Sequence, residues 1–204
     1  GSYLNWKNKK IHSGLIGDVG CISFNGNKII TTGEGGAIIT KSKTIHKKIL
    51  HLSSQAKKDQ INFIHNEIGY NYRMNGLTSA LGVAQLKKLP KYLHLKKNIN
   101  IQYKNLFKKT SYEILSNPPN SISNNWINIL ILNEKKIANK RKKLINHLLL
   151  NNIEVRPIWK LNHLQDPYKK FQKFKINNAN DLLSKCICLP SSPNLTMKEI
   201  KYIY

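Results

Sequence analysis

Residues 17–40 read GDVGCISFNGNKIITTGEGGAIIT, and this stretch decides how the chain folds. Two short apolar, β-branched runs, residues 21–24 and 37–40, have the composition of strands. Between them lie Asn, Gly and Thr, the mixture expected of a tight loop whose amides and hydroxyls face a polar ligand. The stretch therefore predicts a strand–loop–strand unit that holds a ligand.

The interior of this loop contains one lysine, Lys28, and no carboxylate lies between Asp18 and Glu34 to pair with it. If the strands are buried, the amine is partly desolvated, which lowers its pKa and makes a neutral nucleophile available. The alternative is that Lys28 is one of many surface lysines in a lysine-rich chain. Spacing alone favours that alternative, because no pattern makes a single lysine a nucleophile.

Length and composition limit the remaining possibilities. With 204 residues and 40% apolar content, the chain can bury one fair-sized core or two small ones. It has no run of eighteen or more apolar residues, so no membrane-spanning helix is expected. Cys21, Cys186 and Cys188 are odd in number and lack metal-ligand spacing. We therefore expect free, buried thiols in a reducing cytoplasm, and neither disulfides nor a metal site.

The net charge is strongly positive: 34 Lys+Arg against 10 Asp+Glu give +24. This excess taken directly suggests a nucleic-acid-binding protein. However, the lysines are spread over nearly every segment, and no helix-turn-helix, finger or RNA-recognition signature is present. Lys, Ile and Asn are over-used together, as in A+T-rich coding sequences, so we interpret the charge mainly as compositional bias.

The segment Ser23-Phe24-Asn25-Gly26-Asn27-Lys28, followed by T-T-G-E-G-G over residues 31–36, resembles the lysine segment of one enzyme family. These are the pyridoxal-phosphate-dependent sugar aminotransferases of the DegT/DnrJ/StrS family. In that family the lysine carries the cofactor covalently, and the serine hydrogen-bonds the cofactor phosphate. The resemblance thus implies that Lys28 is catalytic and that Ser23 and Lys28 bind pyridoxal 5'-phosphate.

A second informative stretch, residues 65–75, reads HNEIGYNYRMN and ends in Asn75, a plausible N-cap for the following helix. By itself it could be an ordinary aromatic loop before a helix. In the family, G-x-N-x-R followed by a helix ending in A-Q-L is a second signature, matched here by Gly69, Asn71 and Arg73. The resemblance implies that Asn71 reaches across a dimer interface to the partner's cofactor phosphate, and that Arg73 lies near the substrate.

The third stretch is Arg156-Pro157-Ile158-Trp159, followed by His163. A lone histidine is more often structural than catalytic. In the family, R-P-x-W with a following histidine brings the small domain back to the active site, which implies substrate-binding roles for Arg156 and His163. Residues 189–196, LPSSPNLT, resemble the family's closing L-P-x-x-x-x-L-T element before the last helix.

The other segments are predicted from periodicity and turn residues. They are an irregular lead-in over residues 1–16, a helix over 45–52, a polar connection over 53–66, a helix broken by Pro90 and resumed over 91–107, a turn at 117–120, a strand over 126–132, a basic helix over 134–150 and a strand over 153–155.

The resemblance covers essentially the whole chain and implies an α/β fold. We expect the C-terminal portion of an aspartate-aminotransferase-like protein of PLP fold type I: the last strands of the large-domain sheet plus a small α+β domain. The expected division is residues 1–60 for the end of the large PLP-binding domain, 61–110 for connecting helices and 111–204 for the small C-terminal domain.

The function implied by the resemblance is transfer of an amino group from an amino-acid donor, glutamate in most members, to a nucleotide-linked 4-keto sugar in bacterial surface-glycan biosynthesis. We expect a cytoplasmic homodimer with shared active sites, and no specific nucleic-acid or membrane partner. Most strands that precede the lysine in this family are missing, so we expect a truncated chain. The alternatives are an inactive remnant, a split subunit whose N-terminal half is separately encoded or, with less support, a basic nucleic-acid-binding protein.

Overall fold

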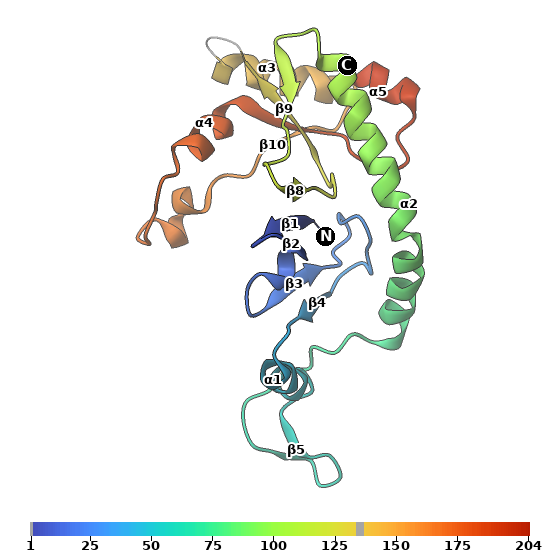
Figure 1. Cartoon of the computed structure of the whole chain (residues 1–204), viewed down its shortest axis with the longest axis vertical. Helices are drawn as coiled ribbons and strands as arrows, with labels where there is room; N and C mark the ends of the chain where they lie inside the picture. Colours follow the sequence, from blue (N-terminus) through green and yellow to red (C-terminus); the bar gives the residue numbers. More distant parts are fainter. Residues whose placement is uncertain (1, 134–136) are drawn as a thin grey trace. The chain divides into compact units, whose positions relative to one another are not determined.

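The computed structural model describes residues 2–133 and 137–204, and the chain divides into two compact units (Figure 1). Unit 1 comprises Gly1–Lys91 and Pro118–Asn124, and unit 2 comprises Tyr92–Asn117 and Asn125–Tyr204. The long helix α2, Gly76–Phe107, contributes its first half to unit 1 and its second half to unit 2. The predicted boundaries after residues 60 and 110 stay a prediction.

Unit 1 begins with a hairpin, so the predicted irregular lead-in is wrong. β1 (Tyr3–Trp6) pairs antiparallel with β2 (Lys9–His12) and, on its other edge, with β8 (Ser121–Ile122). Lys7 and Asn8 connect the hairpin with φ of 49° and 60°. Positive φ at both central residues is what a two-residue hairpin turn requires. Neither strand contains a fully buried residue, so their sequences are polar and lack the alternating apolar pattern by which strands are predicted.

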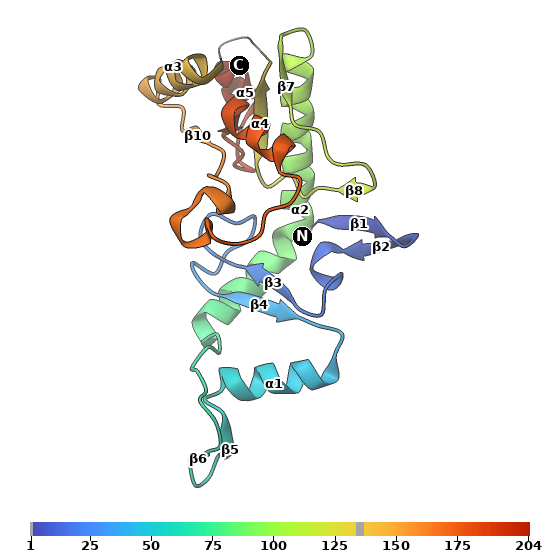
Figure 2. The ribbon, with the colours of Figure 1, turned by 90° about the vertical axis from the view of Figure 1, so that its left-hand side faces the viewer.

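The strand–loop–strand unit predicted over residues 17–40 is present. β3 (Gly20–Ser23) and β4 (Gly36–Ile39) pair antiparallel, with Ser23 opposite Gly36 (Figure 2). α1 (Lys43–Ser53) follows and is capped by the Ser42 side chain, which accepts a hydrogen bond from Ile45 N. The predicted helix is therefore confirmed. Part of the predicted polar connection is instead a hairpin of β5 (Lys57–Asp59) and β6 (Ile64–His65).

Helix α2 runs for 32 residues through Pro90, so the predicted break at this proline is wrong (Figure 1). Its start agrees with the prediction, because the Asn75 side chain accepts a hydrogen bond from Thr78 N at 2.9 Å. An interior proline costs a helix about 3 kcal/mol. Tertiary packing outweighs this cost, since Ile99, Tyr103 and Phe107 beyond the proline are all buried.

Unit 2 contains a four-stranded antiparallel sheet in the order β10-β11-β9-β7. Three α-helices, two 3-10 helices and the second half of α2 accompany it among the described residues. The bounds are β7 (Tyr112–Ile114), β9 (Asn128–Leu132), α3 (Ile137–Leu150), β10 (Arg156–Pro157), η2 (Asn162–Leu164), η3 (Asp166–Tyr168), α4 (Asn177–Lys185), β11 (Cys186–Leu189) and α5 (Met197–Ile203).

Two strand predictions in unit 2 have different outcomes. The strand predicted over residues 126–132 is confirmed over Asn128–Leu132. The strand predicted over 153–155 is wrong, because the chain pairs with β11 only from Arg156 onward. Ile153 and Val155 alternate with an exposed Glu154 as in a strand, yet they fill the core from a connecting segment. The basic helix is confirmed over Ile137–Leu150, and residues 134–136 of that prediction lie outside the described part.

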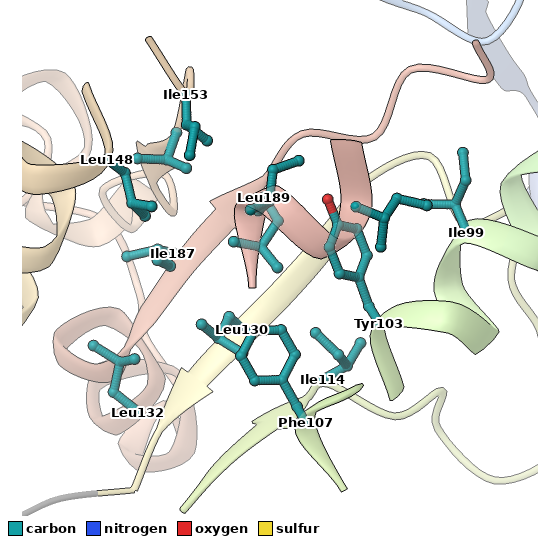
Figure 3. Packing of buried hydrophobic residues seen from close by; sticks show 13 residues of the cluster. Ile99, Tyr103, Phe107, Ile114, Leu130, Leu132, Leu148, Ile153, Ile187 and Leu189 are labelled. Carbon is teal, nitrogen blue, oxygen red and sulfur yellow. The ribbon is translucent and has the colours of Figure 1, made fainter. Parts of the chain in front are cut away.

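The core of unit 2 lies between its sheet and its helices (Figure 3). Alternate residues of β9 and β11, Leu130, Leu132, Ile187 and Leu189, contribute to it, as the period of two in a strand requires. Burying each large apolar side chain contributes about 1.5–3 kcal/mol. The other members are Ile99, Tyr103, Phe107, Ile114, Leu148, Ile153, Val155, Ile200 and Ile203.

Among the described residues, none of the helices combines the length and apolar character that spanning a bilayer requires. The three cysteines are all free thiols, with Cys186 and Cys188 buried and Cys21 exposed. The expected burial therefore holds for two of the three.

Candidate active site

The loop that follows β3 is closed on the carbonyl oxygen of Phe24. This oxygen accepts hydrogen bonds from the main-chain N–H of Thr32 at 3.0 Å and from the Thr31 hydroxyl at 2.8 Å. The Phe24 N–H in turn donates to the carbonyl of Gly35 at 3.0 Å. The loop is thus tied at its base on both sides, which fixes the residues between Phe24 and Thr31 relative to Ser23 at the end of β3.

Lys28 ends a four-residue turn inside this loop. Its main-chain N–H donates to the carbonyl of Asn25 at 3.0 Å, and the Asn25 side chain accepts a hydrogen bond from Gly26 N at 2.8 Å. Such a side-chain acceptor is what favours Asn at the start of turns. Lys28 itself is half-buried. The turn and the closed base together determine where the Lys28 side chain leaves the backbone.

The glycine-rich tail of the loop has a geometric explanation. Gly35 has φ of +88°, in the left-handed region that glycine adopts without strain. A Cβ atom on Gly35 would also lie 3.2 Å from Cε of Met74, so Met74 packs closely against the tail. Thr32 is only 4% exposed, and its hydroxyl donates to the carbonyl of Glu34. Met74 therefore brings the segment around Asn71 to the Lys28 loop within unit 1.

The segment that carries Asn71 and Arg73 is held by the end of α1 through main-chain hydrogen bonds. Tyr70 N donates to the carbonyl of Leu52 at 2.7 Å, and Tyr72 N donates to that of Ser53 at 3.0 Å. Asn71 forms an isolated antiparallel bridge with Ser54, the residue that directly follows α1. The side chains of Asn71 and Arg73 are exposed. Their backbone is therefore fixed while their polar groups face outward.

Two further features stabilise this segment. Gly69 passes so close to α1's exit that a Cβ atom would lie 2.3 Å from Ala56 N, which explains the glycine. The Glu67 carboxylate pairs with Lys48 and lies 3.2 Å from Nε2 of His51, both on α1. The hydrogen bond from Lys48 lowers the pKa of Glu67, although its surroundings are open to solvent. Glu67 thus connects the approach to Asn71 with the adjacent helix.

The remaining predicted site residues, Arg156 and His163, belong to unit 2. Arg156 lies on the edge strand β10 opposite Cys188, and its guanidinium bonds the Glu154 carboxylate at 2.7 Å. His163 lies in η2, is half-buried, and lines a cavity of about 480 Å³ together with Trp159 and others. The structure thus places Lys28 in the loop that follows Ser23, and Asn71 and Arg73 in the adjoining segment of unit 1.

Several residues that build this site were not singled out from the sequence. The Phe24 carbonyl, the hydroxyls of Thr31 and Thr32, and Met74 position the loop. The T-T-G-E-G-G motif contains the two threonines, and hydroxyls beside glycines are a signal of loop closure. The pair of Lys48 and Glu67 gives no such signal, because 19 positions separate the two residues.

A lysine held in a closed loop after a strand, with a serine at the strand end, presents an amine and a hydroxyl to a ligand that carries a carbonyl group and a phosphate. The comparisons with known proteins then identify the family. The chain belongs to the DegT/DnrJ/EryC1/StrS aminotransferase family, whose model matches residues 1–204.

Curated relatives agree with this family. GDP-perosamine synthase of Escherichia coli O157:H7 is 36% identical over 199 residues, which are 97% of this chain and 53% of the relative. The putative pyridoxal phosphate-dependent aminotransferase EpsN of Bacillus subtilis (strain 168) is 34% identical over 192 residues, 92% of this chain and 49% of the relative. The chain therefore spans about half the length of the curated relatives it matches.

Solved structures agree with the fold. Helicobacter pylori PseC, an aminotransferase involved in the biosynthesis of pseudoaminic acid, superimposes with a TM-score of 0.85 at 28% identity, covering 97% of this chain and 54% of PseC. The putative sugar aminotransferase Spr1654 of Streptococcus pneumoniae, in its PLP-form, gives 0.85 at 25% identity over 100% of this chain and 53% of its own. The predicted family, aminotransferase class and α/β fold are confirmed, together with pyridoxal phosphate as the cofactor of this family.

The donors of the Lys28 loop fit this cofactor, which carries an aldehyde and a phosphate. Lys28 offers a primary amine, the group that bonds to an aldehyde carbon. Ser23 Oγ accepts the Asn25 N–H at 3.3 Å, so its own hydroxyl proton can be donated to a phosphate oxygen. In the described part of the chain, no group of three or more His, Cys, Asp or Glu side chains could hold a metal ion.

Proposed function

We propose that this chain contributes the lysine-bearing part of an enzyme that transfers an amino group from an amino acid, glutamate being the expected donor, to a nucleotide-linked 4-keto sugar. The observation that carries the proposal is the Lys28 loop, closed on the Phe24 carbonyl and followed by its glycine-rich return. The names of the relatives support the substrate class, since they include GDP-perosamine synthase and UDP-4-amino-4,6-dideoxy-N-acetyl-beta-L-altrosamine transaminase. Bacterial surface-glycan biosynthesis is the corresponding pathway class.

The proposed roles in unit 1 follow from the chemistry of each side chain. When bound, pyridoxal phosphate supplies a carbon that accepts amino groups and a ring that withdraws electrons from adjacent bonds. The Lys28 amine would hold the cofactor and would carry the proton as general base and acid. Ser23 would donate its hydroxyl proton to the cofactor phosphate. The Asn71 amide would donate to the cofactor phosphate of the neighbouring subunit, and this sharing favours a homodimer.

The proposed substrate contacts are cationic. Arg73 and Arg156 present guanidinium groups. Each can donate two parallel hydrogen bonds to the oxygens of a phosphate, which suits the diphosphate of a nucleotide sugar. His163 would contribute a hydrogen-bonding group from unit 2. The three free thiols support the cytoplasm as the compartment of the enzyme.

The decisive experiment is to label Lys28 in a chimaera. The portion of the E. coli GDP-perosamine synthase that the match leaves uncovered is joined to this chain, incubated with pyridoxal phosphate, reduced with borohydride and mapped by peptide mass. We expect the stable label on Lys28 above all other lysines. Solvent-exposed lysines have a pKa of roughly 10.4, so they are protonated at neutral pH and react only weakly with the aldehyde of the cofactor. Lys28→Ala should abolish the label and amino transfer while retaining part of the cofactor affinity.

Two further variants make this result specific. Lys28→Arg should fail as well, because a guanidinium stays protonated and cannot bond to the aldehyde carbon. Lys43→Ala, at the exposed start of α1, is the matched control and should behave as the parent. A label on another lysine, or turnover in Lys28→Ala, would show that the proposed chemistry is wrong. A folded chimaera without label and without turnover would favour the inactive remnant.

A further inference from the structure

One face of the second half of α2 carries a polar cluster that the proposed reaction does not use. Lys96 donates through its ammonium group to the carbonyl of Ser191, and Tyr103 donates its hydroxyl to the carbonyl of Pro190 at 3.0 Å. Asn100, one turn from Lys96, donates to the side-chain oxygen of Asn128 at 2.8 Å. Three residues of one helix thus bind two segments that are distant in the sequence.

These two segments are also bound to each other. Ser191 Oγ accepts hydrogen bonds from the main-chain N and the side-chain Nδ2 of Asn128, both at 2.9 Å, and donates to the carbonyl of Leu189 at 2.9 Å. Asn128 is only 1% exposed and begins β9, whereas Leu189 ends β11. The end of β11 and the start of β9 are therefore held together by these hydrogen bonds, and both are bonded to α2.

Lys96 is an energetically costly member of this cluster. It is 4% exposed, and in residues 2–133 and 137–204 no carboxylate lies within ion-pair distance of its amine. Burial lowers the pKa of Lys96 to about 8, and desolvation is the one cause of this change. A buried charge without a counter-charge does not stabilise a fold, and a polar group retained at such a site can instead specify one arrangement of the chain.

We propose that Lys96 is a positioning residue that fixes Pro190 and Ser191 and, through β11, the strand that carries Arg156. β10 has two residues and lies at the edge of the sheet, where β11 is its neighbour: Arg156 pairs with Cys188 and Pro157 with Ile187. The position of β10 is therefore determined by β11. The importance of Arg156 for the substrate rests on the proposed function, whereas the positioning itself does not.

Two tryptophans report the position of β10 directly. Trp126 precedes β9 by two residues, Trp159 follows β10 by two residues, and their rings stack with centroids 5.9 Å apart and planes at 24°. A stacked indole pair gives a near-ultraviolet circular dichroism signal that depends on its geometry. The third tryptophan, Trp6, lies in β1, and Trp6→Phe removes its contribution.

The test uses the 204-residue chain with Trp6→Phe and compares three further variants. Lys96→Met keeps the length of the side chain and removes the donor, and Lys96→Arg retains a cationic donor. Lys97→Met alters the adjacent, exposed lysine and is the control. The measurements are the circular dichroism of the tryptophan pair, hydrogen exchange of the Arg156 and Cys188 amides, and urea unfolding.

We expect Lys96→Met to weaken the tryptophan signal and to accelerate exchange at Arg156 and Cys188 about tenfold or more, the effect of losing one charge-assisted hydrogen bond. Resistance to urea at neutral pH should stay the same or increase, because the desolvation cost is removed. Lys96→Arg should restore the signal and slow exchange, and Lys97→Met should resemble the parent.

Other outcomes would overturn the proposal. Unchanged exchange and an unchanged tryptophan signal in Lys96→Met would mean that Lys96 does not position β10. Lower resistance to urea, or failure to fold, would mean that the ammonium group stabilises the fold and has no separate positioning role. Because no cofactor or substrate is present, the proposal can fail while the aminotransferase function stands, and the reverse is equally possible.

Discussion

The buried amine of Lys96 predicts an unusual dependence of stability on pH. The pKa of Lys96 falls from its ordinary 10.5 to about 8 in the folded chain, because burial disfavours the charged form. Below about pH 8 the amine is charged in both states, and the folded state bears the full cost. Between about pH 8 and 10.5 the folded chain releases the proton while the unfolded chain retains it, so stability rises with pH.

The size of this effect follows from the two pKa values. One pKa unit corresponds to about 1.4 kcal/mol, so values of 10.5 and about 8 imply that the charge costs the folded state about 3 kcal/mol at neutral pH. Above about pH 10.5 the amine is neutral in both states, and the cost disappears. Lys96 should therefore add about 3 kcal/mol to the free energy of unfolding as the pH rises through this window.

Other buried groups change stability in the opposite direction over a similar range. Burial raises the pKa of Tyr103 and of Cys188, and it is the main cause that raises that of Cys186 to about 11. Each of these groups ionises more readily in the unfolded chain, so each lowers stability as the pH rises above the unfolded-state pKa. The parent curve alone would therefore hide the contribution of Lys96, and a comparison with Lys96→Met isolates it.

The assay is urea unfolding of the Trp6→Phe chain, followed by the fluorescence of Trp126 and Trp159, with and without Lys96→Met and under reducing conditions. The difference between the two free energies of unfolding should change by about 3 kcal/mol between about pH 7.5 and pH 10.5. Lys97→Met, the exposed neighbour, should follow the parent throughout. Parallel curves for the parent and Lys96→Met would refute the reasoning, because they would mean that the Lys96 pKa is equal in both states.

The remaining predictions concern Asn71 and the thiols. If Asn71 serves the neighbouring subunit, chimaeric Asn71→Ala chains should hold the cofactor less tightly by about 1–3 kcal/mol, and mixing them with Lys28→Ala chains should restore one intact site per dimer. Activity that does not return after proven subunit exchange would place Asn71 in its own subunit's site. Cys21, which is exposed, should react rapidly with a disulfide reagent, whereas Cys186 and Cys188 should react only on unfolding; equal rates at neutral pH would contradict their burial.

The sequence predicted best those segments whose motifs require a particular backbone. The strand–loop–strand unit over residues 17–40 was predicted because the run from Phe24 to Gly36 contains an Asn-Gly turn, two hydroxyls and glycines, which close the loop on itself. Asn75 was found because a helix start leaves N–H groups that a side-chain oxygen can accept. In each case the hydrogen bond joins residues a few positions apart, so the residue types that form it can be recognised in the sequence.

The failures are of another kind, because they depend on contacts distant in the sequence. Pro90 lies inside α2 because the buried residues beyond it hold the helix together. Ile153 and Val155 alternate like a strand, but which segment pairs with β11 is decided by the sheet and begins at Arg156. Lys96 looks like any other lysine of a basic helix, and its burial depends on Ser191, which is 95 positions away.

The same distinction bears on how variants of the Lys28 loop should be interpreted. The bonds that close the loop come from the main chain of Phe24, Thr32 and Gly35 and from the hydroxyl of Thr31, and the turn is closed by the main-chain N–H of Lys28. None of these bonds requires the Lys28 side chain, so all of them can form in Lys28→Ala. Loss of labelling and turnover in that variant would therefore report the missing amine, and not a displaced loop.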